Sequence, residues 1–307
     1  MQNILDWTEA RIPDFSGKVI LITGGSSGIG REAGIVLAEK NATVILASRD
    51  EIRFQQAVKG LSYKNNIHFI APLDLSDRIS IENFAKDFKK VFNRLDVLIN
   101  NAGIMNSPYE PSICGVENQF GVNHLGHFFL CGCLLDVIMN TANSRVINVS
   151  SISAHDAVYD PSLIHSNDPN ERISAYKFSK LASLYFTNEL DKRFKQNGIP
   201  SISLAVHPGY VKTGLQRHTK GVLRKLHVYY TQWRYAQKPS SGALPILRAS
   251  TEEMVLGNSY IFPGAQDGLS GSPIIDELPE IAKNERNAKE IWDLSEELLN
   301  FTFIFKS

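Results

Sequence analysis

A tyrosine and a lysine four residues apart form the first pair in this chain that could do chemistry. Tyr176 and Lys180 lie in the run YKFSK, and on a helix this spacing places both side chains on one face. A phenol, with an ordinary pKa of about 10, is a poor acid or base at neutral pH, but a nearby ammonium group favours the phenolate. We therefore expect Tyr176 to exchange a proton with a substrate oxygen and Lys180 to lower the tyrosine pKa.

Two polar residues earlier in the chain could complete this site. Ser151 follows the apolar run Arg145–Val149, so its hydroxyl would lie at the carboxyl end of a strand, where open α/β sheets bind ligands. Asn123 lies in a helical stretch that could return its amide to the same cleft. The predicted catalytic residues are Asn123, Ser151, Tyr176 and Lys180.

A glycine-rich turn, TGGSSGIG at residues 23–30, follows the first apolar run. Glycines let the backbone pass close to a pyrophosphate, and the helix that follows offers unpaired N–H groups and a positive dipole end. Its spacing is GxxxGxG, and three glycines could also simply form a tight corner between strand and helix. The predicted contacts with a dinucleotide are Gly24, Ser26, Ser27, Gly28, Ile29 and Gly30.

The end of the second apolar run indicates which dinucleotide would bind. An NAD-binding site places an acid there to hydrogen-bond the ribose 2′-hydroxyl. This chain has Ser48 and Arg49, and a guanidinium group can pair with a 2′-phosphate, with the serine hydroxyl as a further donor. Asp50 is a competing acid one residue later, and both charges could also belong to a solvated loop. The residues favour NADP(H) over NAD(H).

Short apolar runs alternate with helical patterns in the order expected of βαβ units. Continuous apolar runs suit parallel strands that are covered on both faces, so we predict one doubly wound α/β domain over residues 1–307, a Rossmann fold. The strand-like runs are Lys18–Thr23, Thr43–Ser48, Ile67–Ala71, Leu95–Ile99, Arg145–Val149, Ser201–Val206 and Ser259–Phe262. The helical stretches are Ile29–Lys40, Ile79–Phe92, Ile113–Met139 and Ala175–Gln196.

Composition excludes several other classes of protein. Thirty-two basic residues balance thirty-two acidic ones, so no overall field would attract nucleic acid. The first residues contain no apolar signal-peptide core, and no run of about eighteen apolar residues suggests a membrane span, so we expect a cytoplasmic protein. Three cysteines without CxxC spacing are expected to be reduced thiols.

The ordered set of motifs resembles the short-chain dehydrogenase/reductase family over almost the whole chain. The set comprises TGGSSGIG at 23–30, NNAG at 100–103, Asn123, Ser151, YKFSK at 176–180 and HPGYVKT at 207–213. The resemblance implies hydride transfer between a nicotinamide and a carbonyl or alcohol. It also implies that Ser151 orients the carbonyl, Tyr176 is the acid/base and Lys180 binds the nicotinamide ribose, while Asn123 holds a water that relays protons.

The same resemblance implies further cofactor contacts. Asp74 would meet the adenine, Asn100 and Gly103 would line the adenosine side, and a later group would hold the nicotinamide amide. The added residues are Asp74, Leu75, Asn100, Ala102, Gly103, Pro208, Gly209, Val211 and Thr213.

An extended loop over residues 152–175 and the runs NHLGHF at 123–128 and HPG at 207–209 are similar to the branch of retinol dehydrogenase-like and WW-domain oxidoreductase proteins. This resemblance implies a hydrophobic substrate such as a retinoid, a steroid or a lipid-derived aldehyde. Many relatives pair through the tyrosine-bearing helix, which implies a homodimer, although the tail from Pro279 to Ser307 could replace that contact.

A basic and aromatic segment over residues 219–238, within an insertion near residues 214–240, has an apolar helical face. We interpret it as a lid over an apolar substrate, with peripheral membrane contact and a helix packed on the core as the alternatives. His124, His127 and Cys131 also share a helical face, but the histidines belong to the family pattern and a fourth ligand is not evident, so no metal is expected.

Two other functions compete with this interpretation. One is an NADP(H)-binding regulatory or interaction module without turnover, which the complete set of four catalytic residues disfavours. The other is sugar-nucleotide epimerisation, which also uses a tyrosine and a lysine four apart and is disfavoured by the GxxxGxG spacing.

Overall fold

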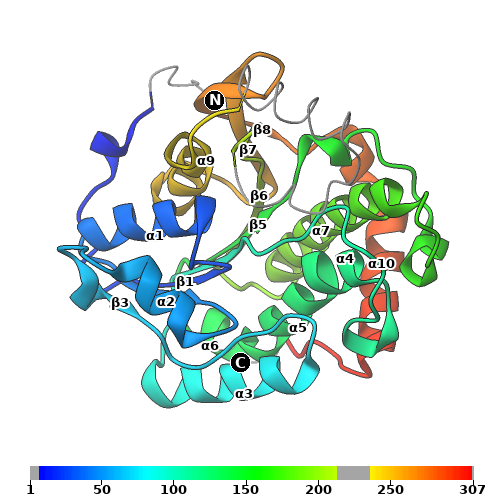
Figure 1. Cartoon of the computed structure of the whole chain (residues 1–307), viewed down its shortest axis with the longest axis horizontal. Coiled ribbons are helices and arrows are strands. Elements are labelled where there is room, and N and C mark those ends of the chain that lie inside the picture. Colours follow the sequence, from blue (N-terminus) through cyan, green and yellow to red (C-terminus); the bar gives the residue numbers. More distant parts are fainter. Residues whose placement is uncertain (1–6, 213–235, 306–307) are drawn as a thin grey trace.

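An eight-stranded sheet forms the centre of the computed structural model, which describes residues 7–212 and 236–305 (Figure 1). The strand order is β3-β2-β1-β4-β5-β6-β7-β8, with seven strands parallel and β8 antiparallel to β7. This order confirms the predicted doubly wound α/β fold. The strands are β1 (Val19–Thr23), β2 (Thr43–Ala47), β3 (Ile67–His68), β4 (Val97–Asn100), β5 (Arg145–Val149), β6 (Ile202–Val206), β7 (Ser259–Ala265) and β8 (Ser270–Glu277).

The central strands are apolar throughout because helices cover both of their faces. Successive side chains point to opposite sides of a strand, so Leu21 of β1 packs in one apolar cluster while Ile20 and Ile22 pack in the other. All three side chains are fully buried. The continuous apolar runs in the sequence therefore follow from burial on both faces.

Helices on the two faces complete a three-layer arrangement (Figure 1). One face is covered by α1 (Gly28–Glu39), α2 (Glu51–Val58) and α9 (Pro239–Thr251). The other is covered by α3 (Arg78–Val91), α5 (Gly126–Cys133), α6 (Leu135–Met139) and α7 (Arg172–Gln196), with α10 (Glu285–Leu299) against α7. Single turns lie at Glu9–Arg11, Lys64–Asn66, Ile113–Gly115, Ile152–Ala154, Pro161–His165 and Glu280–Lys283.

The helical stretch predicted over Ile113–Met139 is interrupted in the structure. Val116 is extended, and a short α4 (Asn118–Phe120) then leads into one wider, π-helical turn at Gly121–Leu125 before α5 begins. Buried Glu117 starts this segment by accepting hydrogen bonds from the backbone of Gln119 and Phe120, both at 2.9 Å. The π turn contains Asn123, one of the predicted catalytic residues.

Three expectations about the surface have different outcomes. The predicted lid over residues 219–238 lies mostly outside the described residues, since only residues 236–238, directly before α9, are described. Among the described helices, none is long and apolar enough to cross a membrane.

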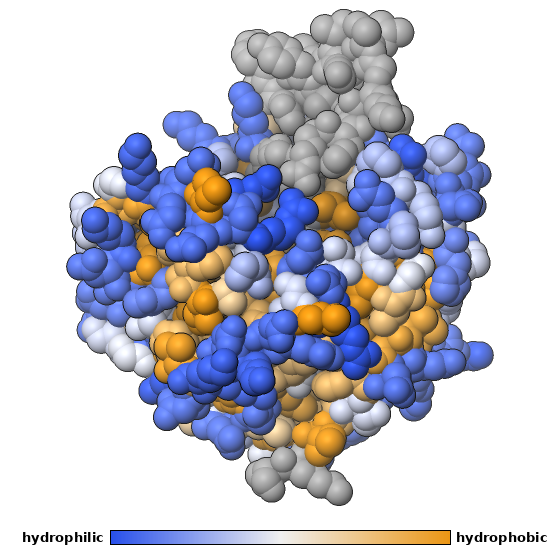
Figure 2. All heavy atoms as spheres, turned by 60° about the horizontal axis from the view of Figure 1, so that its bottom comes forward, coloured by the Kyte–Doolittle hydropathy of each residue, from blue (hydrophilic) through white to orange (hydrophobic). Residues whose placement is uncertain are grey.

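On the face in Figure 2, apolar side chains form patches separated by polar ones. The helix α7 packs against α10, and pairing of two copies through α7 stays a prediction.

Candidate active site

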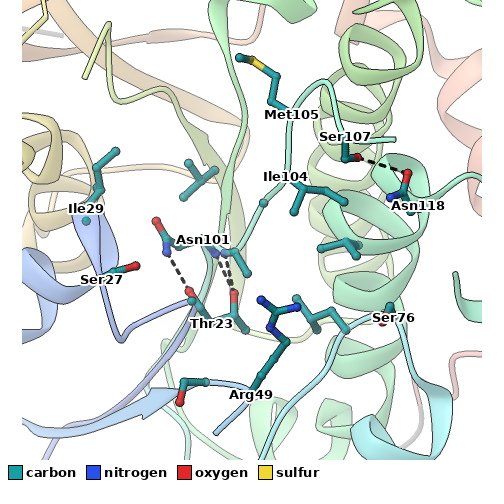
Figure 3. Close-up of a pocket in the computed structure, with 18 of the residues that line it drawn as sticks. Thr23, Ser27, Ile29, Arg49, Ser76, Asn101, Ile104, Met105, Ser107 and Asn118 are labelled. Atoms are coloured by element: carbon teal, nitrogen blue, oxygen red, sulfur yellow. Dashed lines mark hydrogen bonds between the residues drawn. The ribbon is translucent and has the colours of Figure 1, made fainter. Parts of the chain in front are cut away.

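A cavity of about 970 Å³ opens at the carboxyl ends of the parallel strands. Residues at or just beyond the ends of β1, β2, β4, β5 and β6 line it, namely Thr23, Ala47, Asn101, Val149 and His207. Figure 3 shows this cavity, with Ser27 and Ile29 on one side and Ser107 and Asn118 on the other. The topology thus brings together segments that are far apart in the sequence.

The glycine-rich turn presents an uncapped helix end to the cavity. Ser27 is the N-cap of α1, and its side chain forms no capping hydrogen bond, so the first N–H groups of the helix are not satisfied by it. Gly24 and Gly28 have positive φ angles of 65° and 58°, which favour glycine. A Cβ at Gly24 would also lie 2.9 Å from the Cα of Ala102. This loop can therefore bring backbone N–H groups close to an anion.

Gly30 and Asn101 hold the same turn in place from behind. The amide of Asn101 donates to the Thr23 carbonyl at 2.8 Å, a contact drawn in Figure 3. A Cβ at Gly30 would lie 2.5 Å from the Asn101 amide nitrogen. Gly30 does not line the cavity. The structure shows that this glycine allows close packing against Asn101, and its predicted place beside a pyrophosphate stays a prediction.

Two arginines lie at the β2 end of the cavity. Arg49 points into it in Figure 3, and Arg53, one turn into α2, also lines it. Asp50 is engaged elsewhere, because its carboxylate accepts from the Arg53 backbone N–H at 2.7 Å and pairs with the Arg53 guanidinium at 3.0 Å. The Ser48 hydroxyl donates to the Asp50 carbonyl at 2.7 Å, so in this arrangement its proton is already used.

Tyr176, Ser151 and Lys180 lie together on the cavity wall. The first turns of α7 carry Tyr176 and Lys180, which are both buried, and Ser151 directly follows β5. Burial raises the pKa of Tyr176, and a hydrogen bond with the Ser151 side chain lowers it only in part. Burial also lowers the pKa of Lys180 to about 8, and its Nζ donates to the Val149 carbonyl at 2.8 Å.

In this arrangement burial dominates the pKa of Tyr176, and the expectation that Lys180 lowers it stays a prediction. The tyrosine pKa moves upward because the loss of hydration on burial outweighs the hydrogen bond with Ser151. The lysine nitrogen is held by a carbonyl of β5. At neutral pH the phenol is therefore protonated.

The side-chain amide of Asn123 is hydrogen-bonded at both ends to other residues of the site. Its Oδ1 accepts from the Ile104 N–H at 2.8 Å, and its Nδ2 donates to the Ile104 carbonyl at 3.0 Å and to Ser179 Oγ at 2.9 Å. A Cβ at Gly103 would lie 3.3 Å from Asn123 Oδ1 and 3.5 Å from Lys180 Nζ. The amide thus fixes the cavity wall after β4 and the helix that carries Lys180.

The other predicted cofactor contacts divide into three groups. Several line the cavity: Ser26, Ser48, Asp74, Leu75, Ala102, Gly103, Pro208 and Gly209. Asn100 and Val211 do not, since Asn100 is buried and donates to Asn148 at 2.8 Å, and Val211 forms an isolated bridge with Gln237. Thr213 lies outside the described residues. The sequence analysis did not predict Arg53 as a cofactor contact. Its spacing of four residues from Arg49 could have indicated that the two side chains lie on one side of the cavity.

The residues considered for a metal site have other partners. His127 contacts Thr23 and Asn123, and His124 contacts Ser295 Oγ at 2.9 Å. Burial raises the pKa of the Cys131 thiol. Within residues 7–212 and 236–305, no three His, Cys, Asp or Glu side chains gather as metal ligands would.

The cavity fits a dinucleotide by its own chemistry. An uncapped helix end and positive-φ glycines lie beside Ser27, arginines lie at one end, and buried Tyr176 and Lys180 lie at the other. The helix end could bind the anionic pyrophosphate, and the arginines could bind a ribose that carries a phosphate or a hydroxyl. Tyr176 and Lys180 lie where a carbonyl would react. The fold and the site together define a nicotinamide-dinucleotide oxidoreductase.

Comparisons with known proteins agree with this class. The model of the short chain dehydrogenase family matches residues 18–221. Human retinol dehydrogenase 12 is 35% identical over 294 residues, which cover 95% of this chain and 88% of that protein. Mouse retinol dehydrogenase 11 is 37% identical over 293 residues, which cover 92% of this chain and 86% of that protein. The chain therefore belongs to the short-chain dehydrogenase/reductase family, and it is retinol dehydrogenase-like.

Solved structures show the same fold. An uncharacterized protein from Mycobacterium paratuberculosis has a TM-score of 0.79 and 33% identity, with 97% of this chain and 99% of that chain covered. The RhlG/NADP active-site complex of Pseudomonas aeruginosa has a TM-score of 0.63 and 26% identity, with 80% of this chain and 94% of that chain covered. The family membership makes this chain a carbonyl/alcohol oxidoreductase that uses NAD(P)(H).

Proposed function

We propose that this protein uses NADP(H) to interconvert a carbonyl and an alcohol on a hydrophobic small molecule, with Tyr176 as the acid/base. The observation that carries the proposal is the meeting of Tyr176 and Ser151 at a cavity wall beside the buried ammonium group of Lys180. When bound, the nicotinamide would supply or accept the hydride. The side chains would then supply the proton and hold the substrate oxygen.

Each catalytic side chain has a distinct part in this proposal. Ser151 would donate to the substrate oxygen and orient it toward Tyr176. Because the pKa of Tyr176 is raised, its phenol is protonated at neutral pH and is ready to give a proton to a carbonyl oxygen. Lys180 would attract the developing phenolate and hold a ribose hydroxyl.

Arg49 and Arg53 support NADP(H) as the cofactor. Both line the end of the cavity next to β2, and Asp50, the acid that could have met a ribose 2′-hydroxyl, is engaged by Arg53 and by the start of α2. Two guanidinium groups can hold a 2′-phosphate through charge-assisted hydrogen bonds. The NADP complex among the similar structures agrees with this choice.

An apolar wall supports a hydrophobic substrate. Beyond the catalytic residues, where Ser107, Glu110, Ser112 and Asn118 also line the cavity, a group of apolar side chains could pack against rings or chains. They are Ile104, Met105, Pro108, Pro111 and Val122. The retinol dehydrogenases among the relatives agree with a substrate of this kind, such as a retinoid, a steroid or a lipid-derived aldehyde.

Two measurements test the proposal. Consumption of NADPH and NADH with retinoid, steroid and long-chain aldehydes should show turnover, whereas a UDP-sugar control should show none. No turnover with any carbonyl would instead favour a binding module. Arg49→Asp should move the ratio of kcat/KM from NADP(H) toward NAD(H) by about tenfold or more, because the acid repels a 2′-phosphate and accepts from a 2′-hydroxyl. An unchanged ratio would place the selection elsewhere.

A further inference from the structure

His127 of α5 is a buried polar side chain whose two ring nitrogens reach two different parts of the site. Its exposed fraction is 3%. Its Nε2 lies 2.8 Å from the Thr23 hydroxyl, at the end of β1 and directly before the glycine-rich turn. Its Nδ1 lies 3.0 Å from the main-chain carbonyl of Asn123, in the π turn. One imidazole therefore spans the predicted cofactor loop and the turn that carries Asn123.

The surrounding groups determine where the protons lie. The Asn123 carbonyl can only accept, so Nδ1 must carry the proton of the neutral ring and Nε2 must accept. The Thr23 oxygen accepts from the N–H groups of Asn101 and Ala102 at 2.9 and 3.0 Å. Its own proton has two acceptors within reach, His127 Nε2 at 2.8 Å and the Ile99 carbonyl at 3.4 Å, and the shorter contact favours His127. Burial lowers the pKa of His127 to about 3, so the ring stays neutral.

Each end of this bridge bears directly on the reaction site. Thr23 lines the cavity and is bonded to Gly24, and through Asn101 and Ala102 it also fixes the chain after β4. The Asn123 carbonyl further accepts from Ser183 Oγ at 3.3 Å, one turn beyond Lys180 on α7. A shift at one end would therefore be transmitted to the other.

We propose that His127 is a positioning residue that couples the cofactor-binding loop to the helices carrying Asn123 and Lys180. Its two hydrogen bonds set the distance between the dinucleotide site and the proton-donating site, so that both are assembled together. The inference rests on cofactor binding by the family, and its effect on turnover rests on the proposed function.

His124 is a matched control for this proposal. It lies three residues earlier, is equally buried at 1% exposed, and burial lowers its pKa to about 3 as well. Its Nε2 contacts Ser295 Oγ of α10, and its ring packs against aromatic side chains, away from the cavity. A purely structural need for a buried histidine would therefore be shared by both positions.

The first experiment compares His127→Leu with His124→Leu. We expect His127→Leu to raise the Kd of NADPH, measured by fluorescence titration, by about fivefold and to lower kcat by at least as much, since two hydrogen bonds are lost. His124→Leu should lower the melting temperature but leave Kd and kcat within about twofold. Equal changes in Kd for the two variants, or none for His127→Leu, would overturn the proposal.

The second experiment approaches the bridge from its other end, in case His127→Leu does not fold. Thr23→Val should reproduce the weaker NADPH binding, whereas Thr23→Ser, which keeps the hydroxyl, should restore it. In the protein without cofactor, ¹⁵N NMR of histidine should show the Nδ1–H form of His127, unchanged between pH 5 and 8. The Nε2–H form would contradict the bridge. These readouts decide the coupling even if no carbonyl substrate is turned over.

Discussion

The two faces of α7 hold tyrosines in different surroundings. Tyr176 faces the cavity, where it meets the Ser151 side chain, and neighbouring Ser179 and Lys180 are also buried and hydrogen-bonded. Tyr185, two and a half turns later, is fully buried, and its hydroxyl accepts from Asn287 of α10 at 3.2 Å. The same residue type therefore lines the cavity, where we propose that it transfers a proton, on one face, and packs two helices together on the other.

Aromatic contacts distinguish the second face further. Trp292 of α10 lies with its ring centre 4.7 Å from that of Phe303 and 5.0 Å from that of Phe128, and Phe186 of α7 completes the cluster at 5.9 Å from Trp292. Here stability comes from buried apolar area, which is not directional. On the cavity face, hydrogen bonds set orientation and contribute little net stability. Substitutions on the two faces should therefore separate activity from stability.

Tyr176→Phe should give the largest effect and should affect activity alone. Loss of the proton donor should lower kcat by roughly 10²–10⁴-fold, while NADPH affinity changes little because the phenol acts on the substrate. Steady-state kinetics, NADPH titration and thermal unfolding of one preparation would check this. Turnover comparable to that of the unsubstituted protein would remove Tyr176 from the mechanism.

Trp292→Ala should give the opposite pattern. Loss of this fully buried ring should cost roughly 3–5 kcal/mol of unfolding free energy and lower the melting temperature by roughly 10 °C. The turnover of each folded molecule should stay within about twofold, since the cluster lies behind α7 and not in the cavity. A selective loss of kcat without destabilisation would show that the two faces are coupled.

Titration of Lys180 should produce a pH effect confined to the cavity face. Its pKa is lowered to about 8 by burial, so it loses its charge as the pH rises through that value. Carbonyl reduction should therefore be level near pH 7 and decline above about pH 8, because a neutral lysine no longer attracts the phenolate. Lys180→Arg keeps its charge and should lack this inflection, even at a lower overall rate. Persistence of the inflection would assign it to another group.

Tyr185→Phe should have the smallest effect and is matched to Tyr176→Phe, because it removes one hydroxyl from the same helix. The ring keeps its contact with Tyr159, and only the hydrogen bond from Asn287 is lost, at a cost of about 1 kcal/mol. Chemical denaturation should detect this loss, and kcat should not change. A large loss of turnover would mean that the packing face also controls the site.

Structural features that depend on burial, such as the parallel strands, could be predicted from the sequence. Features that depend on local backbone geometry could not. The seven parallel strands were predicted because apolar runs mark strands covered on both faces. The antiparallel strand β8 was missed, since Gly271 and Pro273 interrupt its pattern and it lies at the edge of the sheet. The break before α4 was hidden by an apolar spacing that continues through it.

Residue types identified most of the candidate site, but not how its members contact one another. Motif positions placed Tyr176, Lys180 and Ser151 together at the cavity. They could not reveal that burial outweighs other influences on the tyrosine pKa, or that Gly30 packs against Asn101. Such properties depend on neighbours that the fold brings in from distant parts of the chain.

The position of α10 in the sequence has a consequence for biosynthesis. Trp292 and Phe303 follow the eight strands of the described sheet, so the ribosome makes them after this sheet and α7 are already synthesised. Until they arrive, Phe128 and Phe186 lack the partners that cover them in the finished structure. The nascent protein would therefore expose an aggregation-prone aromatic surface late in translation, and chaperones would be most useful at this stage.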